Sequence, residues 1–453
     1  MPSTGFTDPA PRFTQLADWL AWQETQHPKL IDMGLARIRQ VAARLDATLG
    51  GHLLRPKAKT ILVAGTNGKG SCVASMAALF RTQGLSVGCY TSPHLLRYNE
   101  RIQINGLEAS DDALCAAFTA IDQACGEISL SYFEFGTLAA FWLMAQANVD
   151  VWLIEVGLGG RLDATNIIDA DIAIITSIAL DHEAYLGDTR ELIALEKLGI
   201  ARKNSLLICA EPNPPTSLLE GAEQLGCPVL WAGKDFSWCA ELSAEWRPEW
   251  SPEAPKITLT LSQNRSVHIA AAQLPLPSIA AAWVACDVIC NALGQTPDST
   301  EWAQVLTHTR LAGRWQRFTC QGVDVLIDVA HNPASTQALA EHIGHQAKPF
   351  VLLMGMMADK NIAESLKPLR QAQHLFAVNL PIERAASAAQ LAEQARAQGI
   401  SASEHEQVAA ALEQALAQCR ETGARLVVCG SFYTLAAAYP ALTALAACEV
   451  CNG

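Results

Sequence analysis

The fold of this chain is decided around the stretch Thr60-Ile61-Leu62-Val63-Ala64-Gly65-Thr66-Asn67-Gly68-Lys69-Gly70-Ser71. Its first five residues are mostly apolar and β-branched, which predicts a buried strand that runs into a glycine-containing turn. Residues 71–82 then predict a helix, and Gly84 marks its end. Such a turn points backbone N–H groups and the positive end of a helix dipole at one place, and Lys69 adds a full charge. The stretch therefore predicts a phosphate-binding loop.

The loop departs from the common pattern GxxxxGK[ST], in which a lysine directly precedes a hydroxyl residue. Val63 stands where the first glycine would be, and Gly70 separates Lys69 from Ser71. A glycine turn that binds no nucleotide is the alternative. The strand before the turn and the helix after it favour the phosphate-binding interpretation.

Further apolar segments follow the same order of strand, turn and helix. Residues 149–156 and 171–178 predict strands that are hydrophobic almost throughout, as in a parallel sheet covered on both faces. Alternation of strands and helices predicts a doubly wound α/β fold. A second α/β series begins with residues 323–329, and we place the domain boundary near residue 296, giving domains 1–296 and 297–453. Between the two series, residues 257–261 and 266–270 predict a small antiparallel pair.

Composition excludes several classes of function. The net charge of -13 argues against a nucleic-acid surface, which needs clustered Lys and Arg. The N-terminus lacks the pattern of a signal peptide, and the charge-free residues 426–448 predict a strand and a buried helix rather than a membrane span. The 14 cysteines have no regular spacing, which predicts reduced thiols and a cytoplasmic protein. We interpret Cys448 and Cys451 as thiols of a tail, with a zinc site as the alternative.

Polar residues stand at the ends of several predicted strands. Ser92, Glu155, Asp181 and His182 follow apolar runs, and ligands of open α/β sheets bind beyond the carboxyl ends of the strands. Oxygen-rich groups beside a phosphate loop are typical of a magnesium site, because Mg²⁺ also bridges nucleotide phosphates. Capping or core hydrogen bonds are the alternative for each residue alone.

Four further residues with charged or titratable side chains lie close to predicted strands or helices. Lys197 lies in a helical stretch with apolar neighbours, and its pattern alone predicts an ordinary solvated lysine. Asp328 and His331 follow the strand at 323–329. Arg314 precedes that strand, and an arginine there could neutralise the charge that develops in phosphoryl transfer, with a plain linker residue as the alternative.

Taken together, these motifs resemble the folylpolyglutamate synthases, which are relatives of the Mur ligases. The resemblance extends from about residue 31 to residue 433. It is carried, in order, by Gly65-Thr66-Asn67-Gly68-Lys69-Gly70-Ser71, Thr91-Ser92-Pro93-His94-Leu95, Glu100-Arg101-Ile102, Glu155-Val156-Gly157-Leu158-Gly159-Gly160-Arg161-Leu162-Asp163-Ala164-Thr165-Asn166 and Asp328-Val329-Ala330-His331-Asn332-Pro333. It implies a Mur-ligase-like N-terminal domain with the phosphate loop and a smaller Rossmann-like C-terminal domain.

The resemblance also implies the activity. It indicates an ATP- and magnesium-dependent ligase that joins L-glutamate to 7,8-dihydropteroate and to the γ-carboxylates of reduced folates through an acyl phosphate. Potassium is a further cofactor that it allows. The alternatives are polyglutamylation alone, a Mur-type ligase of peptidoglycan precursors, and a non-catalytic ATP-binding regulator. We expect a monomer with small-molecule substrates and no nucleic-acid or membrane partner.

Finally, the resemblance implies roles for individual residues, with Lys69, His182 and Lys197 as catalytic groups. ATP would be held by Gly65, Thr66, Asn67, Gly68, Lys69, Gly70, Ser71, Arg314, Asp328 and His331. Metal would be held by Ser92, Glu155, His182 and Lys197, the last as a carbamate. The pterin substrate would be held by Ser131, Tyr132, Phe133, Glu134, Leu162, Asp163 and Ala164. One departure is Ser278, which replaces the asparagine that contacts nucleotide in the family.

Overall fold

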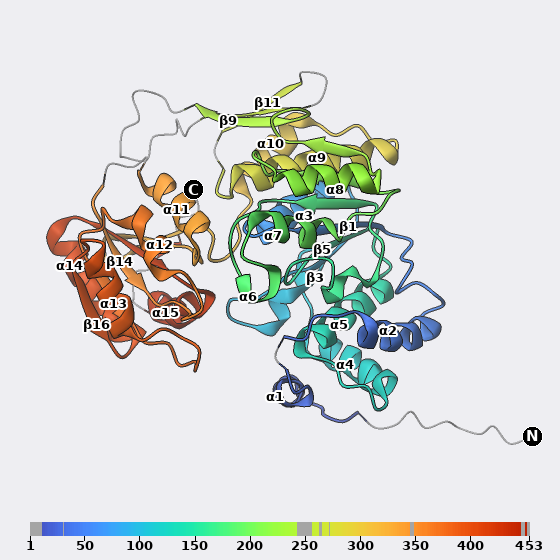
Figure 1. The fold of residues 1–453 in the computed structure, drawn as a ribbon, viewed down its shortest axis with the longest axis horizontal. Coiled ribbons are helices and arrows are strands. Elements are labelled where there is room, and N and C mark those ends of the chain that lie inside the picture. The colour runs from blue at the N-terminus through green and yellow to red at the C-terminus, as the bar shows by residue number, and fades with distance from the viewer. Residues whose placement is uncertain are drawn as a thin grey trace, which may run out of the picture.

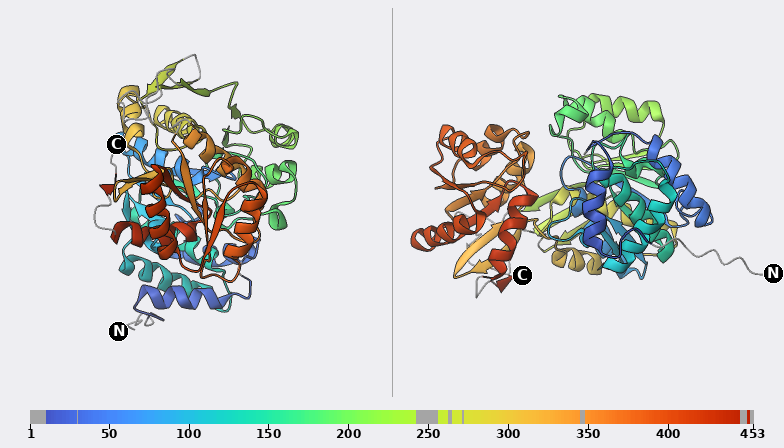
Figure 2. Two further views of the ribbon diagram at one scale, coloured as in Figure 1. Left: turned by 90° about the vertical axis from the view of Figure 1, so that its left-hand side faces the viewer. Right: turned by 90° about the horizontal axis from the view of Figure 1, so that it is seen from below.

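The computed structural model of this chain describes residues 11–29, 31–241, 256–261, 265–270, 272–344, 348–444 and 449–450. Two α/β units lie side by side, one coloured blue to yellow and the other orange to red (Figure 1). The view from below shows the same arrangement (Figure 2). Each unit has its own sheet and its own cores.

The first sheet has eight strands in the order β4-β3-β2-β5-β1-β6-β7-β8. The six strands β2, β5, β1, β6, β7 and β8 are parallel to one another. The strands β3 and β4 add an antiparallel edge beside β2. Their bounds are β1 Lys59–Ala64, β2 Val87–Tyr90, β3 Ile102–Ile104, β4 Leu107–Glu108, β5 Val151–Glu155, β6 Ile172–Ile175, β7 Leu206–Cys209 and β8 Val229–Trp231. The central strands are buried throughout, as predicted from their continuous hydrophobicity.

Helices cover both faces of this sheet, which confirms the predicted doubly wound fold. One face carries α3 (Lys69–Thr82), α9 (Leu276–Ala292) and α10 (Ser299–His308). The other face carries α1 (Leu16–Gln26), α2 (Ala36–Thr48), α4 (Asp111–Cys125), α5 (Tyr132–Ala147), α7 (Arg190–Leu198) and α8 (Thr216–Leu225). Short helical turns lie at η1 (Tyr98–Arg101), η2 (Ala164–Ile167) and α6 (Glu183–Leu186).

A small antiparallel sheet lies beyond α9 and has the order β11-β10-β9. Its strands are β9 Ser237–Glu241, β10 Lys256–Thr260 and β11 Ser266–Ile269. The pairing of β10 with β11 confirms the antiparallel element predicted there, and β9 is an additional strand.

The second sheet has the order β16-β15-β14-β17-β13-β12-β18 and is parallel from β16 to β13. Its strands are β12 Gln316–Cys320, β13 Val323–Ile327, β14 Phe350–Met354, β15 Leu375–Val378, β16 Ala402–His405, β17 Arg425–Cys429 and β18 Glu449–Val450. One face is covered by α11 (Pro333–Gly344), α12 (Ile362–Leu366), η4 (Lys367–Leu369) and α13 (Ala388–Ala397), and the other by α14 (Val408–Thr422) and α15 (Phe432–Ala444).

The domain boundary near residue 296 stays a prediction. Trp302 of α10 is buried in the first unit, where its indole donates a hydrogen bond to Thr82 Oγ1 of α3 at 3.1 Å. This packing leads us to propose a boundary after His308, which ends α10.

The charge-free stretch at 426–448 forms β17 and α15 up to residue 444. In the part of the chain that the structure describes, no helix has the length and apolar character needed to cross a membrane. Cys448 and Cys451 lie outside the described residues. Eleven described cysteines are free thiols, whereas Cys320 is disulfide-bonded, so the prediction of reduced thiols is wrong at that position.

Candidate active site

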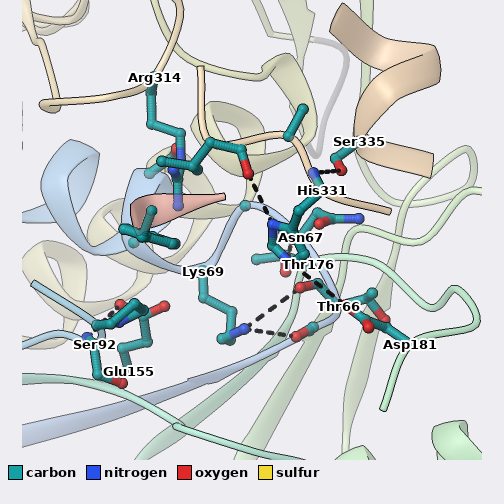
Figure 3. A pocket seen from close by; sticks show the side chains of 18 of the residues that line it. Thr66, Asn67, Lys69, Ser92, Glu155, Thr176, Asp181, Arg314, His331 and Ser335 are labelled. Carbon is teal, nitrogen blue, oxygen red and sulfur yellow. Dashed lines mark hydrogen bonds and ion pairs between the residues drawn. The ribbon is translucent and has the colours of Figure 1, made fainter. Parts of the chain in front are cut away.

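One cleft of about 2050 Å³ brings together all of the residues for which the sequence predicted a role. It is formed where the carboxyl ends of β1, β5 and β6 face the loops that follow β13 and β14 of the second unit. Figure 3 shows the phosphate loop in the middle of this cleft, with Ser92 and Glu155 on one side and His331 and Asp181 on the other. The site therefore lies between the two units, and it lies beyond the carboxyl ends of the strands of the first sheet, where open α/β sheets bind ligands.

The phosphate loop is held by hydrogen bonds to its backbone. Gly65 and Gly68 have φ angles of 155° and 85°, which only glycine adopts without strain. Thr176 donates to the Asn67 carbonyl at 2.7 Å, and Ser278 donates to the Gly68 carbonyl at 2.9 Å. Ser278 thus supports the loop itself, which is a role that the sequence did not predict for it.

Two side chains at the start of α3 are available for a ligand. The Lys69 ammonium group donates back to the carbonyl of Gly65 at 3.0 Å, as Figure 3 shows, and it has no carboxylate partner within the described residues. Ser71 is fully buried, and its hydroxyl has no hydrogen-bond partner in the described part of the chain. A buried polar atom without a partner is costly, so an incoming oxygen ligand would stabilise this arrangement.

Glu155 ends β5 directly beside the phosphate loop. Its side chain is only 5% exposed and accepts the Ser92 backbone N–H at 3.1 Å. Burial raises the pKa of Glu155, although the positive charges of Lys69 and Arg314 oppose this effect. A cation bound beside this buried carboxylate would stabilise its charged form, which has few hydrogen-bond partners of its own.

Lys197 lies on the buried face of α7, with 2% exposure, so the prediction of a solvated lysine is wrong. The helix is rotated so that Leu192 and Leu195 are exposed while Ile193 packs in the core. Burial, with the charge of Lys69 adding to it, lowers the pKa of Lys197 to about 7. A neutral amine is the nucleophilic form of lysine, so this position suits reaction with CO₂.

His182 lies between β6 and α6 with a left-handed backbone, φ 52°. Burial lowers its pKa to about 4, helped by the charges of Lys360, His331 and Lys69. The imidazole is therefore neutral at pH 7, which is the form that binds metal ions.

The second unit reaches the phosphate loop through Asn332, which follows β13. The side-chain amides of Asn332 and Asn67 exchange two hydrogen bonds of 3.0 and 3.1 Å. Asn332 also donates to Asp181 at 3.0 Å, and Lys360 contacts the other oxygen of Asp181 at 2.5 Å. Burial alone would raise the pKa of Asp181, but interactions with His331, His182 and Lys360 hold it well below its usual range.

Arg314, Asp328 and His331 complete the side of the cleft that belongs to the second unit. Asp328 accepts the backbone N–H groups of Trp315 and Ala330, and its charge faces Arg314. His331 Nδ1 donates to the Val329 carbonyl at 2.8 Å, which leaves Nε2 directed at Asp181, 3.6 Å away.

The predicted pterin segment begins α5 at the far side of the cleft. Ser131 and Glu134 form a capping box, in which each side chain accepts the backbone N–H of the other residue. Asp163 is buried and accepts hydrogen bonds from Leu158 and Thr165. Tyr132, Phe133, Leu162 and Ala164 line the same part of the cleft, so both predicted segments face one space.

Comparison with known proteins gives a consistent result. A family model described as Mur ligase, glutamate ligase domain, matches residues 313–432. The dihydrofolate synthase/folylpolyglutamate synthase of Escherichia coli K12 is 37% identical over 424 residues, covering 93% of this chain and 94% of that protein. The Haemophilus influenzae protein of the same name is 39% identical over 381 residues, covering 79% and 82%.

The chain belongs to the folylpolyglutamate synthase family.

Solved structures of this family have the same fold. Escherichia coli FolC in complex with DHPP and ADP has a TM-score of 0.84 and 35% identity, covering 95% of this chain and 98% of that one. The Yersinia pestis bifunctional enzyme complexed with AMPPNP and Mn ion has a TM-score of 0.83 and 36% identity, covering 96% and 99%. The predicted Mur-ligase-like α/β fold is thus confirmed.

The residues present fit a divalent cation only in combination with other ligands. Among the described residues, no group of three or more His, Cys, Asp or Glu side chains could hold a metal ion alone. Glu155, Ser92 and a carbamate on Lys197 would supply oxygens, and nucleotide phosphates and water would supply the rest. This pattern suits Mg²⁺, which keeps waters and binds through few carboxylates.

Sequence reasoning missed several residues of the cleft. Asn332 lay within a quoted motif, and Lys360 follows β14, so the rule of polar residues after strands could have found both. Residues 31–34, between α1 and α2, also line the cleft. No pattern in the sequence marked that connection.

Proposed function

We propose that this chain is an ATP-dependent ligase that joins L-glutamate to 7,8-dihydropteroate and to the γ-carboxylates of reduced folates. The observation that carries the proposal is the single cleft, which holds a phosphate loop, a buried carboxylate beside it and an apolar, aromatic pocket for an acid substrate. The match of this architecture to full-length relatives of that name supports it. A structure in the family with Mn, AMPPNP and L-glutamate bound supports the choice of co-substrates.

We assign the phosphate loop to ATP. The N–H groups of residues 65–70 and the Lys69 ammonium group would hold the phosphates, and Arg314 would neutralise charge from the opposite unit. Lys69 would exchange its hydrogen bond to the Gly65 carbonyl for a phosphate oxygen. In-line transfer to the substrate carboxylate gives an acyl phosphate, and the amine of glutamate then attacks the carbonyl with loss of phosphate.

Ser92, Glu155, His182 and Lys197 as a carbamate would hold magnesium. When bound, the ion would neutralise phosphate charge and orient the transferred group. The chain itself contributes positioning, exclusion of water and fixed charges, which dominate phosphoryl transfer. Potassium, a monomeric state and a cytoplasmic location remain predictions.

Both segments on the far side of the cleft would bind the pterin substrate. The aromatic rings of Tyr132 and Phe133 offer flat apolar surfaces, and Asp163 offers a buried carboxyl group. Burial raises the pKa of Asp163, and its hydrogen-bond donors oppose this effect. A buried carboxyl group is suited to the N–H groups of a heterocycle.

A phosphate-release assay tests the proposal. Purified protein receives ATP, magnesium and glutamate with dihydropteroate, then with tetrahydrofolate, then with a nucleotide-linked peptidoglycan precursor. We expect release with the first two acids and none with the third. Lys69→Ala should abolish release while circular dichroism stays unchanged. Release with the third acid alone, or full turnover by the variant, would contradict the proposal.

A further inference from the structure

The connection between α1 and α2 forms a wall of the cleft to which the proposed mechanism gives no role. Ile31, Asp32, Met33 and Gly34 line the cleft beside the first turn of α5. The Gly34 backbone N–H donates to the Leu162 carbonyl at 3.3 Å. The wall therefore touches the loop at 162–164 and faces the turn at 131–134, which are the two parts of the proposed pterin site.

A single arginine ties this wall to α5. Arg37 lies in the first turn of α2, and its Nη1 is 2.6 Å from Asp32 Oδ2. Its Nη2 donates to the Asp32 carbonyl at 3.2 Å and to Glu134 Oε1 at 3.1 Å. The guanidinium group is a planar fork with fixed donor directions, so it sets the distance between the two carboxylates that it joins.

Both partners of Arg37 are themselves held in place. Glu134 is 2% exposed, and its other oxygen accepts the Ser131 backbone N–H at 2.8 Å. His27 bonds to Asp32 Oδ2 through Nε2 and to Ser129 Oγ through Nδ1, both at 3.0 Å. The hydrogen bond with His27, more than the charges of Arg37 and Lys29, lowers the pKa of Asp32. The wall is thus held at two points, to α5 through Arg37 and Glu134 and to the segment before α5 through His27 and Ser129.

Arg37 does not itself line the cleft, whereas Asp32 and Glu134 do. It contacts Glu134 in the proposed pterin segment, whereas Lys69 and Glu155 lie at the phosphate loop (Figure 3). Any effect of Arg37 on a substrate must therefore pass through its partners Asp32 and Glu134 and the position of the wall between them. Such an effect would change the fraction of molecules whose pterin pocket is formed, and it would leave the reacting groups unaltered.

We propose that Arg37 is a positioning residue for the acid substrate, acting as a clamp that holds the 31–34 wall against the first turn of α5. This inference rests on the proposed function. If loss of the clamp leaves the pterin pocket formed in about a tenth of the molecules, the apparent affinity for the acid substrate falls about tenfold. The turnover of the bound complex stays the same, because the clamp makes no contact with the reacting atoms.

The experiment compares Arg37→Met and Arg37→Lys with the wild type, and Arg39→Met is the matched control. Arg39 is exposed on the same helix and has no ion pair in the described structure. Steady-state rates give KM and kcat for dihydropteroate and KM for ATP. Calorimetry with dihydropteroate, AMPPNP and magnesium gives a binding constant without turnover, and thermal melts report folding.

For Arg37→Met we expect KM and Kd for dihydropteroate to rise about tenfold, with kcat and KM for ATP within about twofold of wild type. Arg37→Lys keeps the charge but cannot hold both carboxylates, so its KM should be intermediate. An unchanged KM for dihydropteroate or a fall in kcat alone would overturn the clamp. So would a general loss of function, in which kcat falls, both KM values rise and Tm is lower. A wild type without ligase activity would instead refute the proposed function.

Discussion

Replacing Lys197 by methionine should stabilise the protein and inactivate it. Lys197 is 2% exposed, and burial lowers its pKa to about 7 from an ordinary value of 10.5. At about 1.4 kcal/mol for each pKa unit, this gap corresponds to at most roughly 5 kcal/mol for burying the charge. Methionine fills similar space without a charge, and replacing buried ion pairs by apolar residues stabilises proteins by about 1–4 kcal/mol. We expect the free energy of unfolding of Lys197→Met to exceed that of wild type by an amount in that range at pH 7 and below.

The pH dependence has a defined sign. Between pH 7 and 10.5 the folded wild type carries a neutral Lys197 while the unfolded chain still binds a proton. The unfolded state then binds more protons, so wild-type stability rises with pH relative to Lys197→Met. The advantage of the variant should shrink by about 2 kcal/mol between pH 7 and 9. Urea unfolding at each pH, in CO₂-free buffer without nucleotide or metal, measures the difference in unfolding free energy between the two proteins.

Activity provides the second half of this test. The variant cannot form a carbamate, so ligation should fall about 100-fold or more. Lys197→Ala should recover part of its rate with small carboxylates such as acetate. In wild type, ¹³C-labelled bicarbonate should give a carbamate signal that Lys197→Met lacks. If the stability difference between Lys197→Met and wild type does not vary with pH, the buried-charge reasoning is refuted. A wild-type ligation rate in Lys197→Met would refute the carbamate.

Three further predictions concern the phosphate loop, the contact between the units and the metal. Gly68→Ala should cost about 1–2 kcal/mol for its φ of 85° and weaken ATP binding further, because the Ser278 hydroxyl occupies the space of the new Cβ. Gly84 is the control, because it has a φ of 72° and open space where a Cβ would lie. In urea unfolding, Gly84→Ala should lose only the free energy of the backbone strain. Equal effects of the two variants on the ATP affinity measured by calorimetry would contradict a specific role for Gly68. A double-mutant cycle with Asn67→Ala and Asn332→Ala should give a coupling of about 0.5–1.5 kcal/mol in unfolding free energy, and strictly additive effects would show that the amide pair is unimportant. Chelation by EDTA should stop phosphate release and excess Mg²⁺ should restore it, whereas release that persists in EDTA would exclude the proposed metal site.

Much of the fold could be read from local patterns. The strand at β1, the turn at Gly65 and the start of α3 depend on interactions between near neighbours in sequence, so the sequence specifies them directly. The same holds for the parallel strands β5 and β6, whose hydrophobicity is continuous because both of their faces are covered. The strands β9, β12 and β16 lie at or near sheet edges and were missed, since a strand there needs less hydrophobicity and gives a weaker signal.

The helical pattern taken alone predicted a solvated Lys197, and that prediction failed for a related reason. Its helix has apolar residues on more than one face, so periodicity alone could not fix which face is buried. In the folded chain α7 packs on α8, with Leu195 and Leu198 beside Gly221, and Lys197 is turned inward, toward Lys69 and the cleft. The unusual pKa of this lysine therefore arises from tertiary packing.

The sequence by itself determined the chemistry that the chain can perform, because the glycine loop, Lys69 and the residues after the strands are local choices of residue type. Only the tertiary structure decided which groups meet. Asn67 and Asn332 are 265 positions apart, and Arg37 and Glu134 are 97 positions apart. Contacts over such separations depend on how sheets and helices pack, and the packing of distant elements leaves no periodic pattern in the sequence.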